Sequence, residues 1–483
     1  MNSSVSPTDV ATHQIQRMGE LLASQQLAYS QNPMPTANER ISRLALLREA
    51  LLNNQDAISA AISEDFGNRS VYESKIGELA TCLAQITYYS RHIAGWMKPA
   101  NRHIDILHQP AKGWVQYQPL GVVGIISPWN YPLLLSIGPL ICALASGNHA
   151  MIKMSDASPH LGTLLESILS ECFPSDLVSV INDSSADTSV SEAFCRLNFD
   201  QITFTGSPAV GKLVMKAAAE NLVPVLLELG GKCPALVHPS APLREVAERL
   251  AFGKLWNAGQ TCVAPDYVLI PRGKINELSQ EIVHFIKKFY PTLRENSDYT
   301  SIVNDRQYKR LKGLVNDAVK KGATAIEINP ANEDLSKARK IAPTLLSNIS
   351  DDMAVAHEEL FGPLLIIQEY DHIRDAIKYI NDRPRPLALY YFDRSMKRAN
   401  EVAKQTHSGH FGINAVVTHF AQDDLPIGGV GNSGMGKYHG FEGFAAMSNA
   451  RSVMYKPKFY SLRAILPPFG RATHKLALWL MMR

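Results

Sequence analysis

Residues 121–154, which read GVVGIISPWNYPLLLSIGPLICALASGNHAMIKM, decide the fold. They contain in order an apolar run, a helical segment and a second apolar run, at 122–126, near 132–147 and at 150–154. Short apolar runs that alternate with helical segments are typical of βαβ units, in which helical crossovers join parallel strands. The alternation continues through helical segments and apolar runs near 158–172, 177–181, 202–205 and 208–220. We therefore expect a parallel sheet with helices on both faces.

The segments on either side extend this pattern. A second region with the same alternation runs from residue 225 to about 405, and residues 104–118 alternate loosely, which predicts a hairpin. On the amino side, a helix that begins at a Thr36 capping box is predicted over about 36–66, and another over about 72–96. The predicted fold class is α/β, with two parallel-sheet domains and a small β element.

The composition is that of a large globular protein. The chain has 483 residues, of which 46% are hydrophobic and 19% charged. These values exclude a disordered chain, a disulfide miniprotein, a collagen and a coiled coil. At roughly 100–200 residues per domain, the length predicts about two to four domains.

The small positive net charge comes entirely from the C-terminal tail. The chain carries 48 Lys and Arg against 45 Asp and Glu, and seven of the bases follow Glu442, the last acidic residue. Residues 1–442 therefore hold 41 bases against 45 acids. A nucleic-acid partner is not expected, because nucleic-acid-binding domains usually have a basic face.

The cysteines and the apolar segments indicate a cytoplasmic protein. The six cysteines are scattered, with no CxxC pair and no metal-ligand spacing, and the first ten residues lack the layout of a signal peptide. The most apolar stretch, 131–154, contains Pro139, Gly147, Asn148 and Lys153, so it is not expected to span a membrane.

Three motif matches lack the context that their functions need. Residues 206–212 fit the phosphate-binding pattern GxxxxGK, but Leu213 follows where a P-loop needs Ser or Thr to hold Mg²⁺. A P-loop nucleotide hydrolase is therefore only a minor alternative. Residues 429–434 fit GxGxxG but follow no strand. His357 and Glu358 match the start of an HExxH zinc motif, but Phe361 occupies the position of the second histidine. No metal site is therefore predicted.

Cys262 and Glu228 are candidates for covalent and acid–base chemistry. Cys262 lies between Gly259 and Pro265, a setting expected on an exposed loop or helix start, where a thiolate can be favoured. Glu228 follows three apolar residues and precedes a Gly pair, so we expect a strand end at which burial raises the pKa of the carboxyl towards that of a general base. A lone cysteine is more often structural, and we interpret Cys233 in that way.

Five motifs together resemble the aldehyde dehydrogenase superfamily over nearly the whole chain. In chain order they are Pro119-Leu-Gly-Val-Val-Gly-Ile-Ile-Ser-Pro-Trp-Asn130, Phe204-Thr-Gly-Ser-Pro-Ala-Val-Gly211, Leu227-Glu-Leu-Gly-Gly-Lys232, Gly259-Gln-Thr-Cys262 and Glu359-Leu-Phe-Gly-Pro363. The segments around Cys262-Val-Ala-Pro-Asp-Tyr267 and Tyr438-His-Gly look like the class 3 group. The segments His419-Phe-Ala-Gln-Asp-Asp and His439-Gly-Phe-Glu-Gly-Phe444 look most like bacterial coniferyl aldehyde dehydrogenases.

The resemblance implies NAD-dependent oxidation of an aldehyde to a carboxylic acid. The expected substrate is coniferyl aldehyde or another aldehyde of the cinnamaldehyde type. The alternative substrate is a medium- or long-chain aliphatic aldehyde. Cys262 is the implied nucleophile, Asn130 an oxyanion donor and Glu228 the base that activates water. The implied cofactor residues are Lys153, Asp156, Gly206, Ser207, Gly211, Glu359 and Phe361. The family usually has Lys-Pro-Ser-Glu where this chain has Lys153-Met-Ser-Asp156. NAD is therefore the expected cofactor, and NADP is kept as the alternative.

The resemblance also implies an aldehyde dehydrogenase fold with two Rossmann-like domains. We expect an NAD-binding domain at 1–100 and 119–226, a catalytic domain at 227–410 and a bridging or oligomerisation element at 101–118 and 411–450. Residues 451–483 are interpreted as a basic amphipathic tail, which we expect to pack on the protein or on a second subunit of a homodimer rather than on a membrane surface.

Overall fold

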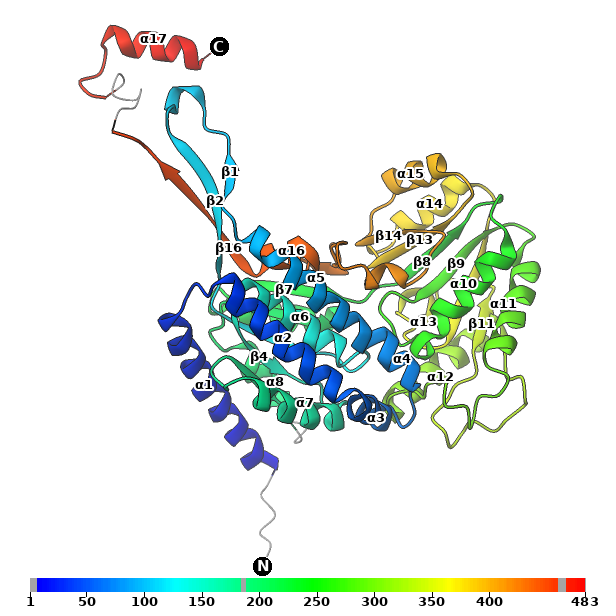
Figure 1. Cartoon of the computed structure of the whole chain (residues 1–483). Helices are drawn as coiled ribbons and strands as arrows, with labels where there is room; N and C mark the ends of the chain where they lie inside the picture. The colour runs from blue at the N-terminus through cyan, green and yellow to red at the C-terminus, as the bar shows by residue number, and fades with distance from the viewer. Residues whose placement is uncertain (1–6, 184–187, 459–465, 483) are drawn as a thin grey trace, which may run out of the picture.

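The structure is a computed structural model that describes residues 7–183, 188–458 and 466–482. Its strands form three sheets, of six, seven and three strands. Figure 1 shows the two larger sheets side by side in separate lobes, while the three-stranded sheet extends outwards from the first lobe as an arm. The expected α/β class with two largely parallel sheets and a small β element is confirmed.

The first lobe is built on the six-stranded sheet, whose order is β15-β7-β6-β3-β4-β5. Its strands are β3 (Val122–Ile126), β4 (His149–Lys153), β5 (Val178–Ile181), β6 (Gln201–Gly206), β7 (Val225–Leu229) and β15 (Gly434–Met435). All neighbours are parallel except β15, which pairs antiparallel with β7. The crossover helices are α6 (Leu134–Ser146), α7 (Pro159–Cys172), α8 (Thr188–Cys195) and α9 (Pro208–Ala219). Helix α6 is buried along its whole length, as its largely apolar sequence predicts.

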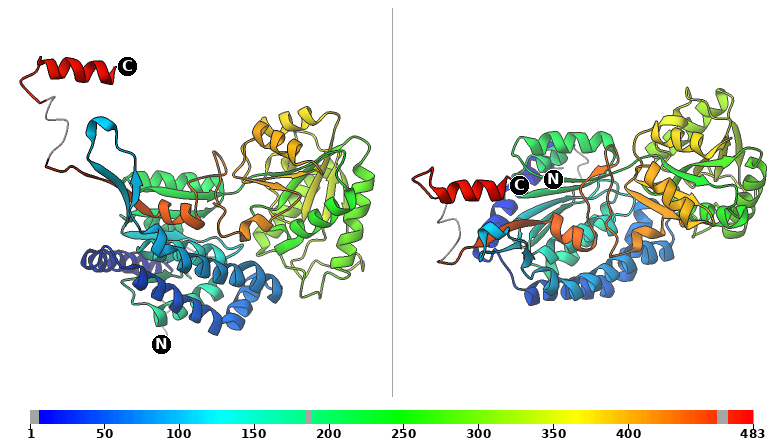
Figure 2. Two further views of the ribbon diagram at one scale, coloured as in Figure 1. Left: turned by 45° about the horizontal axis from the view of Figure 1, so that its top comes forward. Right: turned by 90° about the horizontal axis from the view of Figure 1, so that it is seen from above.

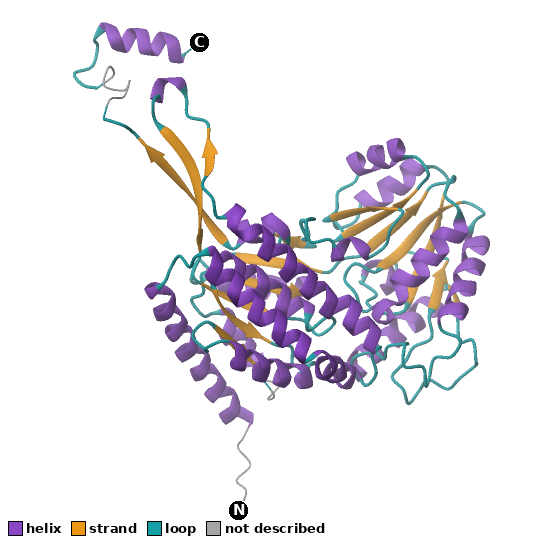
Figure 3. Ribbon diagram, in the orientation of Figure 1, coloured by secondary structure: helices purple, strands orange, loops and turns teal. Residues whose placement is uncertain are grey.

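The N-terminal helices pack on this lobe (Figure 3). They are α1 (Pro7–Gln31), α2 (Ala37–Asn53), α3 (Gln55–Phe66), α4 (Val71–Ser74), the π-helix η1 (Lys75–Ala80) and α5 (Thr81–Trp96). The predicted capping box at Thr36 is present, and the buried stripe of α2 packs on α5 and α6. The predicted single helix over 36–66 is wrong in one respect, because the chain leaves helical geometry at Asn54.

The second lobe is built on the seven-stranded sheet, whose order is β10-β11-β12-β9-β8-β13-β14. Its strands are β8 (Cys233–Val237), β9 (Pro265–Pro271), β10 (Thr324–Glu327), β11 (Thr344–Ser347), β12 (Leu364–Tyr370), β13 (Ala388–Phe392) and β14 (His410–Ile413). Its helices are α10 (Leu243–Leu255), α11 (Ile275–Phe289), α12 (Asp305–Lys320), α13 (Ala354–His357), α14 (Ile373–Asn381) and α15 (Met396–Gln405), with short 3₁₀ turns η3 (Trp256–Gly259) and η4 (Thr418–Ala421). Separate apolar clusters contain alternate residues of strands such as β9, as expected for a sheet covered on both faces.

The arm consists of β1 (Ala100–Arg102), β2 (Lys112–Pro119) and β16 (Ser448–Tyr455), with the 3₁₀ turn η2 (Ile106–His108) between the first two. Strands β1 and β2 form the predicted hairpin, and β16 pairs antiparallel with β2. Helix α16 (Gly440–Ala446) lies at the base of the arm, and α17 (Ala472–Met481) lies near its tip in both views of Figure 2.

The strand pairing corrects the expected boundaries at three places. The boundary between 226 and 227 lies inside β7, which belongs wholly to the six-stranded sheet. Residues 411–413 complete β14 rather than the bridging element, and 451–455 complete β16 rather than the tail. The expected boundaries followed motif limits, whereas hydrogen bonding to neighbouring strands decides which sheet a residue joins. Two parts of the predicted tail, 459–465 and 483, lie outside the described residues.

Candidate active site

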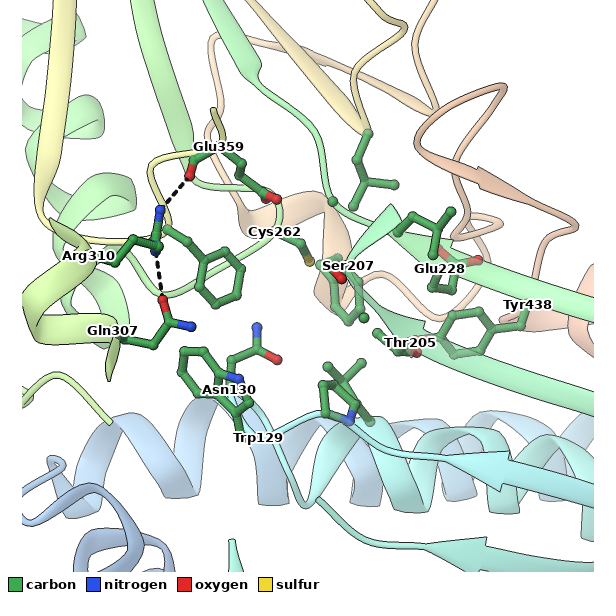
Figure 4. A pocket seen from close by; sticks show the side chains of 18 residues that line it. Trp129, Asn130, Thr205, Ser207, Glu228, Cys262, Gln307, Arg310, Glu359 and Tyr438 are labelled. Carbon is green, nitrogen blue, oxygen red and sulfur yellow. Dashed lines mark hydrogen bonds between the residues drawn. The ribbon is translucent and has the colours of Figure 1, made fainter. Parts of the chain in front are cut away.

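A cavity of about 270 Å³ lies between the two lobes. Figure 4 shows the side chains around it. The lining residues are Pro128, Trp129, Asn130, Leu135, Thr205, Gly206, Ser207, Glu228, Leu229, Gly230, Cys262, Gln307, Arg310, Glu359, Phe361, Leu387, Phe420 and Tyr438. The first lobe contributes the carboxyl ends of β3, β6 and β7, whereas the second contributes the loops that precede β9 and β12. The cavity thus has the position expected for a ligand site in an α/β protein.

Cys262 lies on a tightly turned loop after η3. Asn257, Ala258 and Gly259 have φ of 53°, 50° and 74°, so three consecutive residues adopt the left-handed conformation. A Cβ at Gly259 would lie 2.3 Å from the carbonyl oxygen of Gly362, so only glycine allows the cysteine loop to approach the Glu359 loop this closely.

The structure corrects the expectation of a favoured thiolate at Cys262. Burial, together with the nearby carboxyls of Glu359 and Glu228, raises the pKa of the Cys262 thiol to about 12. The loop is strained but lies between the lobes, where a thiolate loses much of its hydration and lies near two carboxyl groups. A neutral thiol needs a base that accepts its proton before it attacks.

Glu228 supplies a carboxyl with the properties of such a base. It lies near the end of β7, opposite Thr205 of β6 and Gly434 of β15. Burial raises the pKa of Glu228 to about 8, against the smaller opposing effects of the Lys437 ammonium and the Gly429 backbone N–H. The predicted increase is therefore confirmed. The Glu228 Oε1 atom is buried and has no hydrogen-bond partner among the described residues.

Asn130 follows β3 and faces the same cavity as Cys262. Its side-chain Nδ2 donates to the carbonyl of Gln260, 3.2 Å away. Its main-chain carbonyl accepts from Nη1 of Arg69 at 3.1 Å and from Nδ2 of Asn257 at 3.0 Å. The asparagine amide is therefore tied to the cysteine loop and retains a second N–H for a ligand.

Glu359 and Phe361 also line the cavity. Burial and the nearby Asp266 raise the pKa of the Glu359 carboxyl to about 8, and its Oε1 atom is buried without a partner among the described residues. Phe361 has a φ of 48° and packs edge-on against Trp129, with ring centroids 5.3 Å apart. The guanidinium of Arg310 donates to the carbonyls of Glu359 and Leu360, which fixes this loop.

The segment 206–212 forms a turn at the start of α9. Gly206 and Ser207 line the cavity, and the Ser207 hydroxyl caps the helix by accepting from the Val210 N–H. Gly211 lies outside the cavity, and a Cβ there would lie 2.6 Å from the Leu229 side chain, so this glycine allows α9 to pack on β7. Lys212 is exposed and does not line the cavity, which removes support for the P-loop alternative.

Lys153 and Asp156 lie at the end of β4, and neither lines this cavity. The Lys153 Nζ atom is 3.0 Å from Asp156 Oδ1, and its side chain is buried whereas the aspartate is partly exposed. The structure brings these two predicted residues together, at the same edge of the sheet as Ser207 but outside the cavity that holds Cys262.

A second cavity, of about 280 Å³, reaches Cys262 from another side. It is mostly apolar and is lined by Ile76, Gly77, Thr81, Tyr131, Leu134, Leu135, Phe252, Trp256, Thr261, Cys262, Val263, Val417, Thr418, Phe420, Ala421 and Gln422. Cys262, Leu135 and Phe420 line both cavities. The thiol is therefore accessible from the first cavity, which contains more polar groups, and from the aromatic second cavity.

Sequence reasoning missed several residues of the site. Arg310 and Gln307 lie on α12, where no pattern separates them from other polar residues of an amphipathic helix. The residues of the aromatic cavity come from four separate segments, so no local motif contains them. Trp129 lies inside a motif that was recognised, but its packing on Phe361 depends on the approach of the two lobes.

The described residues contain neither a metal-binding cluster nor a membrane-spanning helix. Within 7–183, 188–458 and 466–482, no group of three or more His, Cys, Asp and Glu side chains could hold a metal ion. In the same part of the chain, no helix has the length and apolar character that crossing a membrane requires.

Comparisons with known proteins agree with this geometry. The sequence profile of the aldehyde dehydrogenase family matches residues 10–453. The chain is 48% identical to a probable coniferyl aldehyde dehydrogenase of Pseudomonas aeruginosa over 97% of both chains. It is 43% identical to a coniferyl aldehyde dehydrogenase of Pseudomonas sp. over 95% of both. The structure is similar to the substrate-bound state of Staphylococcus aureus AldH, with a TM-score of 0.89, 33% identity, and coverage of 96% of this chain and 99% of that one.

Proposed function

The chain belongs to the aldehyde dehydrogenase family and is thus an oxidoreductase that acts on aldehydes; we propose that it oxidises coniferyl aldehyde, or a closely related planar aromatic aldehyde, to the carboxylic acid with NAD⁺. The position of Cys262 at the junction of the first cavity, which holds buried carboxyl groups, and the aromatic second cavity carries this proposal. A thiol in that position can contact an aldehyde bound in the second cavity and a cofactor bound in the first.

The first step is addition of the Cys262 sulfur to the aldehyde carbon. The thiol is neutral in the unliganded protein, so its proton must leave; the ionised fraction of Glu228 can accept it, because Glu228 lines the same cavity and its Oε1 atom has no hydrogen-bond partner among the described residues. The carbonyl oxygen becomes an oxyanion as the C–S bond forms. The Asn130 side-chain N–H and the Cys262 backbone N–H are the donors we assign to this oxyanion, and one such donor typically contributes about 3–4 kcal/mol.

The first cavity has features that fit a dinucleotide. Glu359 Oε1 is a buried acceptor without a partner among the described residues, suited to a ribose hydroxyl, and Gly206 and Ser207 lie at the positive end of α9, which suits a pyrophosphate. Enzymes of this family use NAD(P), and we assign Lys153 and Asp156 to the adenosine ribose. When bound, the nicotinamide accepts the hydride that leaves the substrate carbon. Phe361 limits the space beside the ring.

Thioester hydrolysis completes the reaction. Removal of hydride leaves an acyl group on Cys262. Glu228 releases the thiol proton to solvent, and water then attacks the acyl carbon after losing a proton to Glu228. The acid leaves, and the Cys262 sulfur recovers its proton from Glu228. Overall, one aldehyde, one NAD⁺ and one water give one acid, one NADH and one proton.

The second cavity supports an aromatic substrate. Phe252, Trp256, Phe420 and Tyr131 supply ring surfaces on which a planar conjugated aldehyde can stack. Similarity to two coniferyl aldehyde dehydrogenases supports the same assignment. The aliphatic residues of the cavity keep a medium- or long-chain aliphatic aldehyde as the alternative.

A substrate panel tests the proposal directly. NADH formation would be measured with coniferyl aldehyde, benzaldehyde and a C6–C12 aliphatic series, with the Cys262→Ala protein as the blank. The highest kcat/KM for coniferyl aldehyde is expected. A higher value for the C10 or C12 aldehyde would replace the aromatic assignment, and no NADH with any aldehyde would overturn the function.

We further propose a cytoplasmic homodimer. All six cysteines are free, which suits a reducing compartment, and β16 pairs with β2 alone among the described residues, so its other edge is open to a second copy. We assign the basic tail to packing on that copy or on the protein itself.

A further inference from the structure

A buried ion pair lies directly behind the Asn130 loop. The Arg69 Nη1 atom lies 2.7 Å from Glu78 Oε1, and both side chains are completely buried. The Arg69 guanidinium also packs over the Tyr131 ring, 4.8 Å from its centroid. Neither charged residue lines either of the two cavities at Cys262, so this pair does not contact a ligand bound there.

The pair holds the Asn130 loop at two points. Arg69 Nη1 also donates to the main-chain carbonyl of Asn130, at 3.1 Å. Glu78 Oε2 accepts from the backbone N–H groups of Leu133 and Leu134, at 2.9 and 3.0 Å, where α6 begins. These bonds fix the main chain on both sides of Tyr131.

The same segment also holds the cysteine loop. Glu73, on α4, accepts from the Asn257 backbone N–H at 3.1 Å, within the left-handed turn that precedes Cys262. Asn257 in turn donates through Nδ2 to the Asn130 carbonyl, the acceptor that Arg69 also uses. Tyr131, beneath Arg69, shares a hydrogen bond of 2.7 Å with the Thr261 hydroxyl.

We propose that Arg69 is a positioning residue that sets the Asn130 amide relative to the Cys262 sulfur. The inference rests on the proposed function, because the amide serves as an oxyanion donor there. The Asn130 carbonyl is the point at which the Arg69–Glu78 pair and the cysteine loop meet. Without Arg69, only Asn257 among the described residues donates to the Asn130 carbonyl. The Asn130 side-chain amide then shifts, while both cavities keep their lining residues.

Such a shift affects kcat more than binding. A displacement of about 1 Å at a reacting group can cost about 100-fold in rate. Residues that bind the cofactor lie on other loops, so its KM is expected to change little. Alkylation of Cys262 by iodoacetamide creates no oxyanion, and its rate should therefore be nearly unaffected.

Four variants separate positioning from stability. Arg69→Met removes both contacts, and Arg69→Lys keeps the charge. Arg69→Met combined with Glu78→Gln removes the unpaired buried charge that destabilises the single variant. Arg40→Met is the matched control, because Arg40 is also fully buried and donates to the carbonyls of Pro35 and Ala145, away from both cavities.

For each variant, Tm, kcat, the KM for NAD⁺ and the iodoacetamide rate would be measured. We expect Arg69→Met to lower kcat about 100-fold with the KM for NAD⁺ within about threefold, and Arg69→Lys to recover about tenfold. The double variant should regain Tm but not kcat, whereas Arg40→Met should lower Tm and keep kcat. Recovery of kcat together with Tm in the double variant, or a kcat for Arg69→Met near that of the wild type, would overturn the proposal.

Hydrogen exchange distinguishes failure of this inference from failure of the proposed function. The backbone N–H groups of Leu133 and Leu134 donate to Glu78, whose carboxylate Arg69 holds through its other oxygen. They should therefore exchange faster in Arg69→Met than in the wild type and remain protected in Arg40→Met. This holds even if the wild-type protein oxidises no aldehyde, an outcome that would overturn the proposed function alone. Unchanged exchange in Arg69→Met would show that Arg69 does not hold the loop.

Discussion

The side-chain amide of Asn130 donates a hydrogen bond to the main-chain carbonyl of Gln260, 3.2 Å away. One residue belongs to the loop after β3 in the first lobe, and the other lies two positions before Cys262 in the second lobe. The bond therefore joins the two lobes at the reacting centre. It also orients the asparagine so that its second N–H is available to a ligand beside the thiol.

Replacement of Asn130 by alanine should lower kcat about 10²- to 10³-fold, the usual effect of removing one oxyanion donor. The reason is that charge appears on the substrate oxygen only as the C–S bond forms. Single-turnover NADH formation measures this step. Asn182→Ala is a suitable control, because Asn182 lies at the same sheet edge, bonds to Thr163 and lines neither cavity. An Asn130→Ala protein with more than about a tenth of wild-type activity would contradict the assignment.

Replacement of Glu228 by glutamine should separate the two halves of the reaction. The glutamine can accept a proton neither from the Cys262 thiol nor from water, so NADH should form slowly, through the small thiolate fraction, up to one equivalent, and the acyl-enzyme should then accumulate. The time course of NADH would show the single turnover, and mass spectrometry the acylated Cys262. Steady turnover at the wild-type rate would exclude Glu228 as the base.

The wild-type rate of thioester hydrolysis should rise with pH. Glu228 acts as a base only when ionised, and its pKa of about 8 leaves most molecules protonated at pH 7. The rate is therefore expected to increase about tenfold per pH unit well below pH 8 and to level off above it. A pH series with a pre-acylated enzyme would measure this. A profile that is flat between pH 6 and 9 would contradict a raised pKa.

The sequence predicted the chemical groups of the site better than their environment. The motifs brought Cys262, Glu228, Asn130 and Glu359 together because each lies at the end of a strand or in the loop before one, and such positions follow from the order of the elements. The protonation state of Cys262 could not be predicted from the sequence, because it depends on two carboxyls that approach the thiol from different lobes. Arg69 could not be predicted either, because nothing in its local sequence indicates a contact with a carbonyl 61 positions away.

The fold was predictable to a similar degree. Alternation of apolar runs and helices identified β3, α6 and β4 almost to the residue. The antiparallel strand β15 has two residues and follows a glycine-rich segment, so it carries no periodicity. Its pairing with β7 places Gly434 beside Glu228, a long-range contact that only the packed structure reveals.

The stability of the protein should also depend on Glu228. Its pKa of about 8 in the folded protein lies above the ordinary value of 4.5, so the folded protein retains a proton that the unfolded chain releases between these pH values. The stability contributed by the protonated carboxyl is complete below pH 4.5 and is lost as the pH rises to about 8. The Glu228→Gln protein should therefore gain Tm over the wild type at pH 8 but not at pH 4.5. Equal differences in Tm at both pH values would contradict the shift.

Cys262 should react slowly with iodoacetamide in the absence of ligands. A thiol with a pKa of about 12 is almost entirely neutral at pH 7.5, and the thiolate is the reactive form. The second-order rate should rise about tenfold per pH unit from pH 7 to 9 with no plateau. The Cys262→Ala protein provides the background from Cys172, which is partly exposed. A plateau near pH 8 would show that the loop favours the thiolate after all.

Asp156 should decide between the two nicotinamide cofactors. Its carboxylate is partly exposed beside the Lys153 ammonium, where it can accept from a ribose 2′-hydroxyl and repel a 2′-phosphate. Asp156→Ala removes the repulsion but leaves the ammonium, which then attracts the phosphate. The ratio of kcat/KM for NADP⁺ to that for NAD⁺ should rise about tenfold or more, equivalent to about 1.4 kcal/mol. Glu166→Ala, which removes an acid paired with Arg17 instead, is the charge-matched control. An unchanged ratio in Asp156→Ala would mean that the ribose binds away from the end of β4, and the assignment of both Lys153 and Asp156 would then fail.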